Sequence, residues 1–321
     1  MTIAPATLSI RIARCERGWA STFEPPAGAP IARLLRGKRP EEAAVLVPRL
    51  FSLCGAAQEA AIRSAFGLPV PTALTSRIGA EILTEHVLRL CLVWPSVLGL
   101  APDREVVTLA RNALADDGAA RALRRRLFAP LDGAPRDLSD LSTYRSAADS
   151  APARLLNEVM TQWDGHWGQA DLPEFAPARP VEWDRATQGG RPVENSPAGR
   201  ARSDLLAAIV ERHGKGIVWR IAARLVEVDR LLAGEPAGDP AKGAAEAARG
   251  TLLVRGEGDV DGISAFERLS PTDFALAPGG LLETALATLP LEADAPTGRI
   301  ARLIVETVDP CVATEIEVAD A

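Results

Sequence analysis

The chain has 321 residues, of which 47% are hydrophobic and 24% are charged. A chain of this length can bury a sizeable core, in one large domain or in two small ones. Its formal net charge of −6 argues against nucleic acid or an anionic membrane as the main partner. Its four cysteines are too few for a disulfide framework in so long a chain, which favours a reducing cytoplasm.

The sequence offers neither a membrane span nor a targeting segment. The apolar run at residues 90–100 is far too short to cross a bilayer. The first residues, MTIAP, lack the charged and apolar regions of a signal peptide. We therefore expect a cytoplasmic protein that does not associate with a membrane.

The N-terminal segment predicts a β-hairpin over residues 6–24. Leu8, Ile10 and Ile12 fall on one face of an extended chain, with polar side chains on the other, which is the pattern of a half-buried strand. A turn then leads to a second run that carries aromatic side chains. A stretch rich in proline and glycine at residues 25–30 separates this hairpin from the helical region after it.

A helical body is predicted over residues 40–234. The helix that starts at Pro40 has acidic residues beside its positive dipole end, and we expect it to break at Pro48. The longest predicted helix covers about residues 76–98 and is largely buried. The other helices expected in this body cover residues 56–66, 104–116, 119–128, 201–213 and 217–233. Residues 169–199 are rich in proline, glycine and charge, which predicts an irregular path across the surface.

The last part of the chain, residues 246–321, predicts a second hairpin and then helices. The expected elements are strands at 252–254 and 263–269 around the glycine-rich segment 256–262, and helices around 281–289 and 298–307. Helices thus dominate, with small N-terminal and C-terminal hairpins. The pattern predicts a predominantly α-helical α+β fold, in which both ends of the chain meet within a single domain over residues 1–321.

Two short segments carry cysteines in a distinctive context. Residues 49–58 read RLFSLCGAAQ, and residues 308–317 read VDPCVATEIE. A thiolate binds soft or borderline metals because the deprotonated sulfur is a strong, polarisable donor. A glycine follows Cys54 and permits close approach of the backbone, and a proline before Cys311 fixes the direction of the chain. By spacing alone, each is a lone cysteine, and a free cysteine is commonly a small buried hydrophobe.

Both segments resemble motifs of the large subunits of nickel–iron hydrogenases. Those subunits carry R-I-C-G-x-C-x-x-x-H near the N-terminus and D-P-C-x-x-C-x-x-H at the C-terminal end, and thiolates from the two motifs hold nickel and iron. Each motif here keeps one cysteine, Cys54 in the first and Cys311 in the second. The replaced positions are Phe51, Gln58, Thr314 and Glu317. The resemblance implies metal binding by Cys54 and Cys311, without a tetrathiolate nickel site.

Two further segments resemble the large subunits. Residues 246–252 are similar to the A-R-G-x-L segment, which implies that Arg249 contacts an iron-bound cyanide and that Leu252 lines the apolar pocket around carbon monoxide. Residues 270–274 resemble a degraded P-[ST]-T-W-N, which implies that the Thr272 hydroxyl hydrogen-bonds a second cyanide. Such donors suit cyanide, because its nitrogen accepts hydrogen bonds readily. Without the cysteines, the simpler interpretation is that Arg249 makes a surface ion pair and Thr272 caps a turn.

The replaced residues favour carriage of iron over catalysis. The R-I-E-G motif of the large subunits supplies a proton-transferring glutamate, and Ala13 occupies its place. Glu317 replaces the histidine that marks where maturing large subunits are cut. Cys311 matches the first cysteine of its pair, and Thr314 stands where the second iron-bridging sulfur would be. Either the iron sits slightly differently here, or only Cys54 binds it tightly.

This combination resembles the HupK/HoxV family of hydrogenase expression and formation proteins, which are shortened relatives of the large subunit. The resemblance implies a non-catalytic scaffold for iron that carries cyanide and carbon monoxide ligands, with no nickel. Its expected partners are hydrogenase maturation proteins and the immature large subunit. The alternative is a metal-free chaperone that recruits maturation factors through a large-subunit-like surface.

We expect structural rather than metal-binding roles for the remaining cysteines and histidines. Cys15 lies at a strand end and Cys91 on an apolar helix, where buried structural thiols are the common case. His86 is expected to make a hydrogen bond from a helix face. No pair of histidines has the spacing of metal ligands.

Overall fold

The structure is a computed structural model that describes residues 7–16, 18–27, 30–51, 53–259, 261–292 and 295–319. The ranges predicted from the sequence also include residues 1–6, 17, 28–29, 52, 260, 293–294 and 320–321, which lie outside the described residues.

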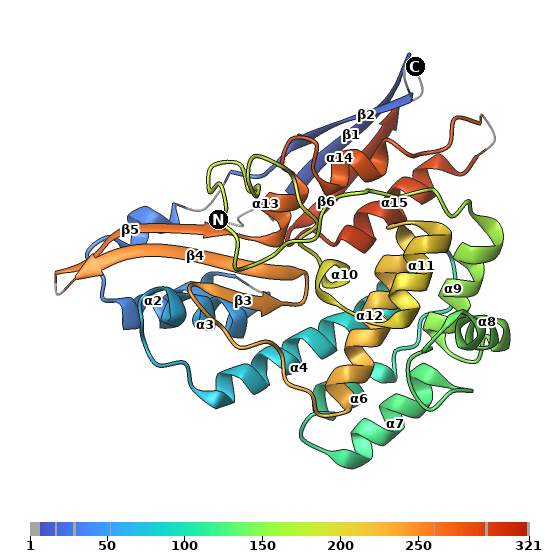
Figure 1. Cartoon of the computed structure of the whole chain (residues 1–321), viewed down its shortest axis with the longest axis horizontal. Coiled ribbons are helices and arrows are strands. Elements are labelled where there is room, and N and C mark those ends of the chain that lie inside the picture. The colour runs from blue at the N-terminus through green and yellow to red at the C-terminus, as the bar shows by residue number, and fades with distance from the viewer. Residues whose placement is uncertain are drawn as a thin grey trace, which may run out of the picture.

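Helices dominate the structure (Figure 1). They are α1 (Ile31–Leu35), α2 (Pro40–Leu50), α3 (Gly55–Ala65), α4 (Thr72–Leu88), α5 (Trp94–Val97), α6 (Val106–Asn112), α7 (Asp117–Phe128), α8 (Leu138–Ala147), α9 (Ala151–Gln162), α10 (Pro197–Arg200), α11 (Asp204–His213), α12 (Ile217–Leu232), α13 (Pro271–Ala275), α14 (Leu281–Leu286) and α15 (Thr297–Val308). A π-helical turn, η1 (Arg89–Val93), joins α4 directly to α5, so the long helix predicted over 76–98 is present with one irregular turn. Every helix predicted from the sequence is found, with small differences at its ends. No helix within the described ranges is long and apolar enough to cross a membrane.

Two expectations about helices are corrected. The helix α2 does not break at Pro48 but continues to Leu50, because a proline this near the end removes a hydrogen bond only from the last turn, while the buried Val47 keeps that turn packed. The helices α8 and α9 lie in a stretch for which no helix was predicted. The start of α9 had a sequence signal, since the Ser150 hydroxyl accepts from the Ala153 N–H at 3.2 Å and a proline stands in the first turn.

One three-stranded sheet joins the two ends of the chain (Figure 1). Its strands, in spatial order, are β2 (Gly18–Glu24), β1 (Thr7–Cys15) and β6 (Ala313–Ala319). The strand β1 runs antiparallel to β2, as the predicted hairpin requires, and parallel to β6. Leu8, Ile10 and Ile12 are fully buried, which confirms the predicted half-buried strand. The strand β6 was not predicted, and it completes the meeting of the two ends.

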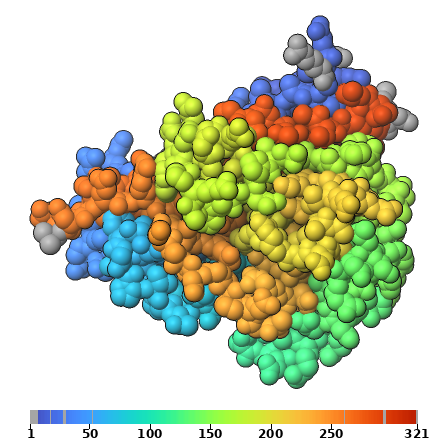
Figure 2. All heavy atoms as spheres, viewed as in Figure 1, coloured from blue at the N-terminus to red at the C-terminus, as the bar shows by residue number. Residues whose placement is uncertain are grey.

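The first sheet packs beside the C-terminal helices. The Trp19 indole N–H on β2 donates to the Pro290 carbonyl at 2.9 Å, which fixes the hairpin against the chain that precedes α15. Figure 2 shows the blue N-terminal and red C-terminal surfaces side by side. Cys15 lies at the far end of β1 and is exposed, so the expectation that it is buried is wrong, whereas Cys91 is fully buried as expected.

A second three-stranded sheet forms from β3 (Ala244–Ala247), β4 (Gly250–Asp259) and β5 (Gly262–Leu269), in that order. The predicted hairpin is present as β4 and β5, and β3 is an additional strand. Gly256 lies within β4 rather than in a turn. A glycine is required there because the Phe66 ring fills the place of a side chain: a Cβ would come within 2.1 Å of the ring. The irregular segment predicted over 169–199 covers this sheet and is visible in yellow-green between the orange strands and the terminal sheet (Figure 2).

Glu227 on α12 ties three segments together in the core. His86 on α4 lies with its Nε2 2.5 Å from one carboxylate oxygen, and Arg200 donates to both oxygens at 2.7 and 2.9 Å. Burial lowers the pKa of His86 to about 4, so its ring is neutral at pH 7, and the expected hydrogen bond from a helix face is confirmed. Burial alone would raise the pKa of Glu227, but the charge of Arg200 and the bond from His86 outweigh it and hold that pKa below its usual range.

We expect Glu227→Gln to lower the free energy of unfolding by about 3–5 kcal/mol, because Arg200 loses its counter-charge in a buried place. Urea denaturation followed by circular dichroism would measure the loss. Glu317→Gln is the matched control, since its pair with Arg11 is exposed and should contribute almost nothing. Equal losses in the two variants would contradict this assignment.

Candidate functional site

A cavity of about 140 Å³ lies where the start of α3, the β3–β5 sheet and the segment after α15 meet. Cys54 and Cys311 both line it, although they are far apart in sequence. Arg249 and Leu252 line the same cavity. Thr272 is not among its lining residues, and its neighbours along the chain lie there instead.

Cys54 caps the start of α3 in a left-handed backbone conformation, with φ 55° and ψ 39°. A residue with a side chain adopts this conformation only at a free-energy cost, of order 1–3 kcal/mol, that the surroundings must offset. Glu81 on α4 supplies part of that support, because its carboxylate accepts the Ala56 N–H at 3.0 and 3.2 Å. A carboxylate from another helix therefore stabilises the start of α3, where Cys54 lines the cavity.

Cys311 follows α15 through a second left-handed residue, Asp309, with φ 62°. The Thr272 hydroxyl on α13 accepts the backbone N–H of Cys311 at 2.8 Å. Thr272 thus fixes the backbone of Cys311 without lining the cavity itself. Its expected contact with cyanide stays a prediction.

Both thiols favour the neutral form. Burial and, to a smaller extent, the neighbouring Cys311 raise the pKa of Cys54 to about 12, against the opposite pull of Arg249. Burial also raises the pKa of Cys311, against the opposite pull of Arg249 and Thr272. Because the thiolate is the form that binds a metal, binding here must release protons.

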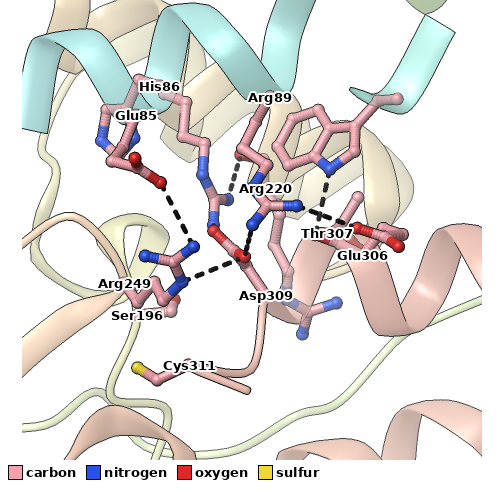
Figure 3. A network of polar contacts seen from close by, with 12 residues as sticks. Glu85, His86, Arg89, Ser196, Arg220, Arg249, Glu306, Thr307, Asp309 and Cys311 are labelled. Carbon is pink, nitrogen blue, oxygen red and sulfur yellow. Dashed lines mark hydrogen bonds and ion pairs between the residues drawn. The ribbon is translucent and has the colours of Figure 1, made fainter. Parts of the chain in front are cut away.

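Arg249 occupies the tight turn between β3 and β4, and only 2% of it is exposed. Its Nε lies 3.1 Å from Asp309 Oδ1, and its Nη2 donates to Glu85 Oε2 at 3.2 Å (Figure 3). Burial would lower the pKa of Arg249, but these carboxylates and the two thiols keep it above its usual range. The interpretation of Arg249 as a surface residue is wrong, because the turn docks into the core.

The turn that carries Arg249 is fixed by the chain before α10. Gly250 has φ 143° and lies so close to Asn195 that a Cβ on it would meet the Asn195 carbonyl oxygen at 2.4 Å. The Asn195 side chain exchanges two hydrogen bonds with the Thr251 backbone, at 2.7 and 2.8 Å. Arg200 donates to the carbonyls on both sides of the turn, at 2.7 and 3.0 Å.

Asp309 is the centre of a cluster of arginines that the sequence did not reveal. Arg89 Nη2 lies 2.8 Å from the same oxygen that faces Arg249, and Arg224 lies 3.9 Å from the other oxygen. Figure 3 shows Asp309 between Arg249 and Arg89, with Cys311 just beyond it along the chain. The sequence contained an indication of this role, because Asp309 is the acidic residue of the D-P-C motif. Only the cysteine of that motif was used to predict the site.

Several polar atoms at the cavity have no hydrogen-bond partner among the described residues. They are Arg249 Nη1, Arg268 Nε and Gln58 Oε1, all buried. Buried polar groups are nearly always hydrogen-bonded in folded proteins, so free donors and an acceptor around one cavity fit a bound polar group. The sequence did not single out Arg268, whose guanidinium lies 4.3 Å from the centre of the Phe51 ring. The one indication of this contact in the sequence was that Phe51 replaces a cysteine of the motif.

The replaced motif positions divide into two groups. Phe51 and Gln58 line the cavity. Thr314 lies in β6 opposite Leu8, and the exposed Glu317 pairs with an arginine of β1, so neither is among the lining residues. Of the two residues considered for the C-terminal side of the site, Cys311 is therefore the one at the cavity.

Curated proteins similar in sequence to this chain are hydrogenase expression/formation proteins. The hydrogenase expression/formation protein HupK of Rhodobacter capsulatus is 37% identical over 304 residues, which cover 93% of each chain. The hydrogenase expression/formation protein HoxV of Cupriavidus necator is 28% identical over 353 residues and covers 90% of each chain. No family model matches the sequence.

Solved structures give the fold. A chain of the Ni-Fe-Se hydrogenase from D. vulgaris Hildenborough superposes with a TM-score of 0.57 at 14% identity, over 92% of this chain and 94% of that one. A chain of an NAD+-reducing [NiFe]-hydrogenase gives a TM-score of 0.55 at 17% identity, over 92% and 93%. These neighbours are large subunits, as the expected fold class requires. The chain therefore belongs to the HupK/HoxV family of hydrogenase expression/formation proteins, built on the fold of the nickel–iron hydrogenase large subunit.

Proposed function

We propose that this protein is a non-catalytic scaffold that holds iron carrying cyanide and carbon monoxide between Cys54 and Cys311 during hydrogenase maturation. The names of its relatives describe expression or formation of hydrogenase, which supports an accessory role. One observation carries the finer proposal: both remaining motif cysteines and a buried guanidinium with a free N–H line the same cavity. The expected partners are maturation proteins and the immature large subunit.

The set of donors suits a metal that brings its own ligands. Within the described residues, no group of three or more His, Cys, Asp or Glu side chains is placed to hold a metal ion. Two sulfurs alone leave a transition metal short of the four or more ligands that it prefers. Iron that already carries cyanide and carbon monoxide needs fewer ligands from the protein, and two thiolates would complete its coordination.

The cavity also matches the chemistry of those ligands. Cyanide nitrogen is a good acceptor, and the free Nη1 of Arg249 would donate a charge-assisted hydrogen bond to it. Bound carbon monoxide accepts hydrogen bonds poorly and suits an apolar wall, which Leu53 and Leu252 provide. Thr272 would fix the backbone of Cys311, and its hydroxyl proton would serve the expected hydrogen bond to a second cyanide.

Release of the cargo follows from the same electrostatics. Because both thiols have raised pKa values, they take up protons readily once the metal leaves. Reprotonation therefore favours transfer of the iron to an acceptor with more acidic thiols. A site with two sulfurs and a strong tendency to reprotonate suits a carrier better than a permanent metal centre.

One observation favours the alternative, a metal-free chaperone. The raised pKa values keep Cys54 and Cys311 protonated at neutral pH, where a thiol is a weak ligand. In that case the large-subunit-like fold alone would recruit maturation factors. Iron content and infrared bands of cyanide and carbon monoxide, measured on anaerobically purified protein, separate the two functions.

We expect Cys54→Ala to abolish iron retention and its infrared bands, and Cys311→Ala to weaken both. Alanine keeps the Cβ, so the left-handed backbone at Cys54 is no more strained than before and the fold should persist. Cys15→Ala is the matched control, because Cys15 is exposed. Full hydrogenase maturation supported by the Cys54→Ala/Cys311→Ala double variant would rule out the carrier and leave the chaperone.

We expect Arg249→Lys to weaken iron retention by about tenfold or more, since it removes a charge-assisted hydrogen bond worth roughly 1.5–3 kcal/mol. Lysine keeps a positive charge beside Asp309, which avoids the loss of stability that alanine would cause in this buried pair. The cyanide infrared bands should shift. Arg89→Lys is the control, because Arg89 also pairs with Asp309 but is not among the residues that line the cavity. Unchanged bands in Arg249→Lys would refute the cyanide contact.

Iron retention should strengthen as pH rises from about 6 to about 9, because each thiol that binds must first lose a proton, and the thiolate fraction grows about tenfold per pH unit below the pKa.

The same pKa values predict slow alkylation of Cys54 by iodoacetamide, with a rate that still rises at about pH 9. Mass spectrometry of the alkylated peptides would measure this rate, with the exposed Cys15 as internal reference. A plateau near neutral pH would show that the thiols are already ionised.

A further inference from the structure

Arg268 on β5 lies between two spaces. It lines the cavity of Cys54 and Cys311, and it also lines an outer hollow of about 570 Å³ on the other side. Its guanidinium stacks on the Phe51 ring, which lines the inner cavity. Arg268 thus forms part of the wall between the cavity and the outer hollow, and Phe51 contacts it on the side of the cavity.

The charge of Arg268 is not balanced locally. Among the described residues, no hydrogen bond or ion pair within 4 Å engages its side chain, and its buried Nε has no partner. Asp273 acts on it from a greater distance, but that carboxylate already accepts two hydrogen bonds from Ser270, at 2.6 and 2.7 Å. The adjacent Glu267 pairs with Arg255 instead.

This imbalance distinguishes Arg268 from the other cation of the cavity. Arg249 faces the carboxylates of Asp309 and Glu85, so its charge is largely offset. Arginine does not lose its proton near neutral pH. Arg268 therefore places a positive charge without a nearby counter-charge among the described residues on the side of the cavity that faces the outer hollow.

We propose that Arg268 determines which metal species the cavity accepts: it disfavours a bare divalent cation and favours iron that already carries cyanide. This inference rests on the proposed carrier function. A divalent ion placed among low-dielectric walls is repelled by an unpaired guanidinium. Electron-rich cyanide nitrogens and thiolates instead attract it and accept its free N–H. The same residue thus protects the two thiols from common metal ions and recognises the ligands of the cargo.

The test uses the full chain with Cys15→Ser and Cys91→Ala, so that Cys54 and Cys311 are its only thiols. Arg268→Met removes the charge and retains an unbranched side chain to pack on Phe51, and Arg268→Lys keeps the charge. Arg255→Met is the matched control, because Arg255 lines only the outer hollow of the two spaces and stacks on Trp183 at 4.8 Å. Zinc affinity is measured by competition with a chromophoric chelator at low ionic strength, and folding is checked by thermal unfolding.

Arg268→Met should bind zinc about tenfold or more tightly than the parent, because a like charge is removed from the site. Arg268→Lys and Arg255→Met should remain close to the parent. Arg268→Met should also retain less iron with cyanide and carbonyl infrared bands. Zinc affinity no higher in Arg268→Met than in Arg255→Met, or undiminished iron retention, would overturn the proposal. A parent protein that retains no iron unit would instead refute the carrier function, and the zinc series would still decide the role of Arg268.

Discussion

One buried carboxylate holds the functional region together. Asp309 meets Arg89 from the π-helical turn, Arg249 from the β3–β4 turn and Arg224 from α12. An arginine buried without a counter-charge costs several kcal/mol, so Asp309 stabilises the packing of these elements, with further carboxylates from Glu85 beside Arg249 and from Glu306 beside Arg89. Arg224 has further support, since its guanidinium lies 4.9 Å from the centre of the Trp94 ring. Because Asp309 stands two positions before Cys311, the ion cluster that stabilises the core also sets one wall of the cavity.

The sequence predicted the elements whose signals are local. Alternation at Leu8, Ile10 and Ile12 was enough for β1, and helical periodicity was enough for most of the helical body. The strand β6 also alternates polar and apolar residues, but a short charged segment becomes a strand only when a partner is available. That partner is β1, at the other end of the chain, and no local pattern identifies it.

The same distinction applies to the candidate site. The motifs led to the residues that line the cavity, because the cysteines and Arg249 lie within short, recognisable segments. The burial of Arg249 depends on Asn195 and Arg200, which lie about fifty positions earlier and fix the turn. The position of Arg268 depends on the register of β4 with β5 and on the Phe51 ring. Contacts of this kind arise from tertiary packing, so composition and spacing do not reveal them.

The parallel pairing of β1 with β6 has a consequence for the order in which the protein folds. It joins residues such as Arg11 and Glu317, which are 306 positions apart. Contacts between such distant segments form slowly, because the entropy lost on closing so long a loop precedes any energy gained from the contact. Cys311 lies two positions before the start of β6, and Cys54 caps a helix that packs on the β3–β4 hairpin. A partly folded chain therefore presents its sulfurs one at a time, and the two come together only when the chain has closed. The proposed carrier function would then require the protein to fold before it takes up iron.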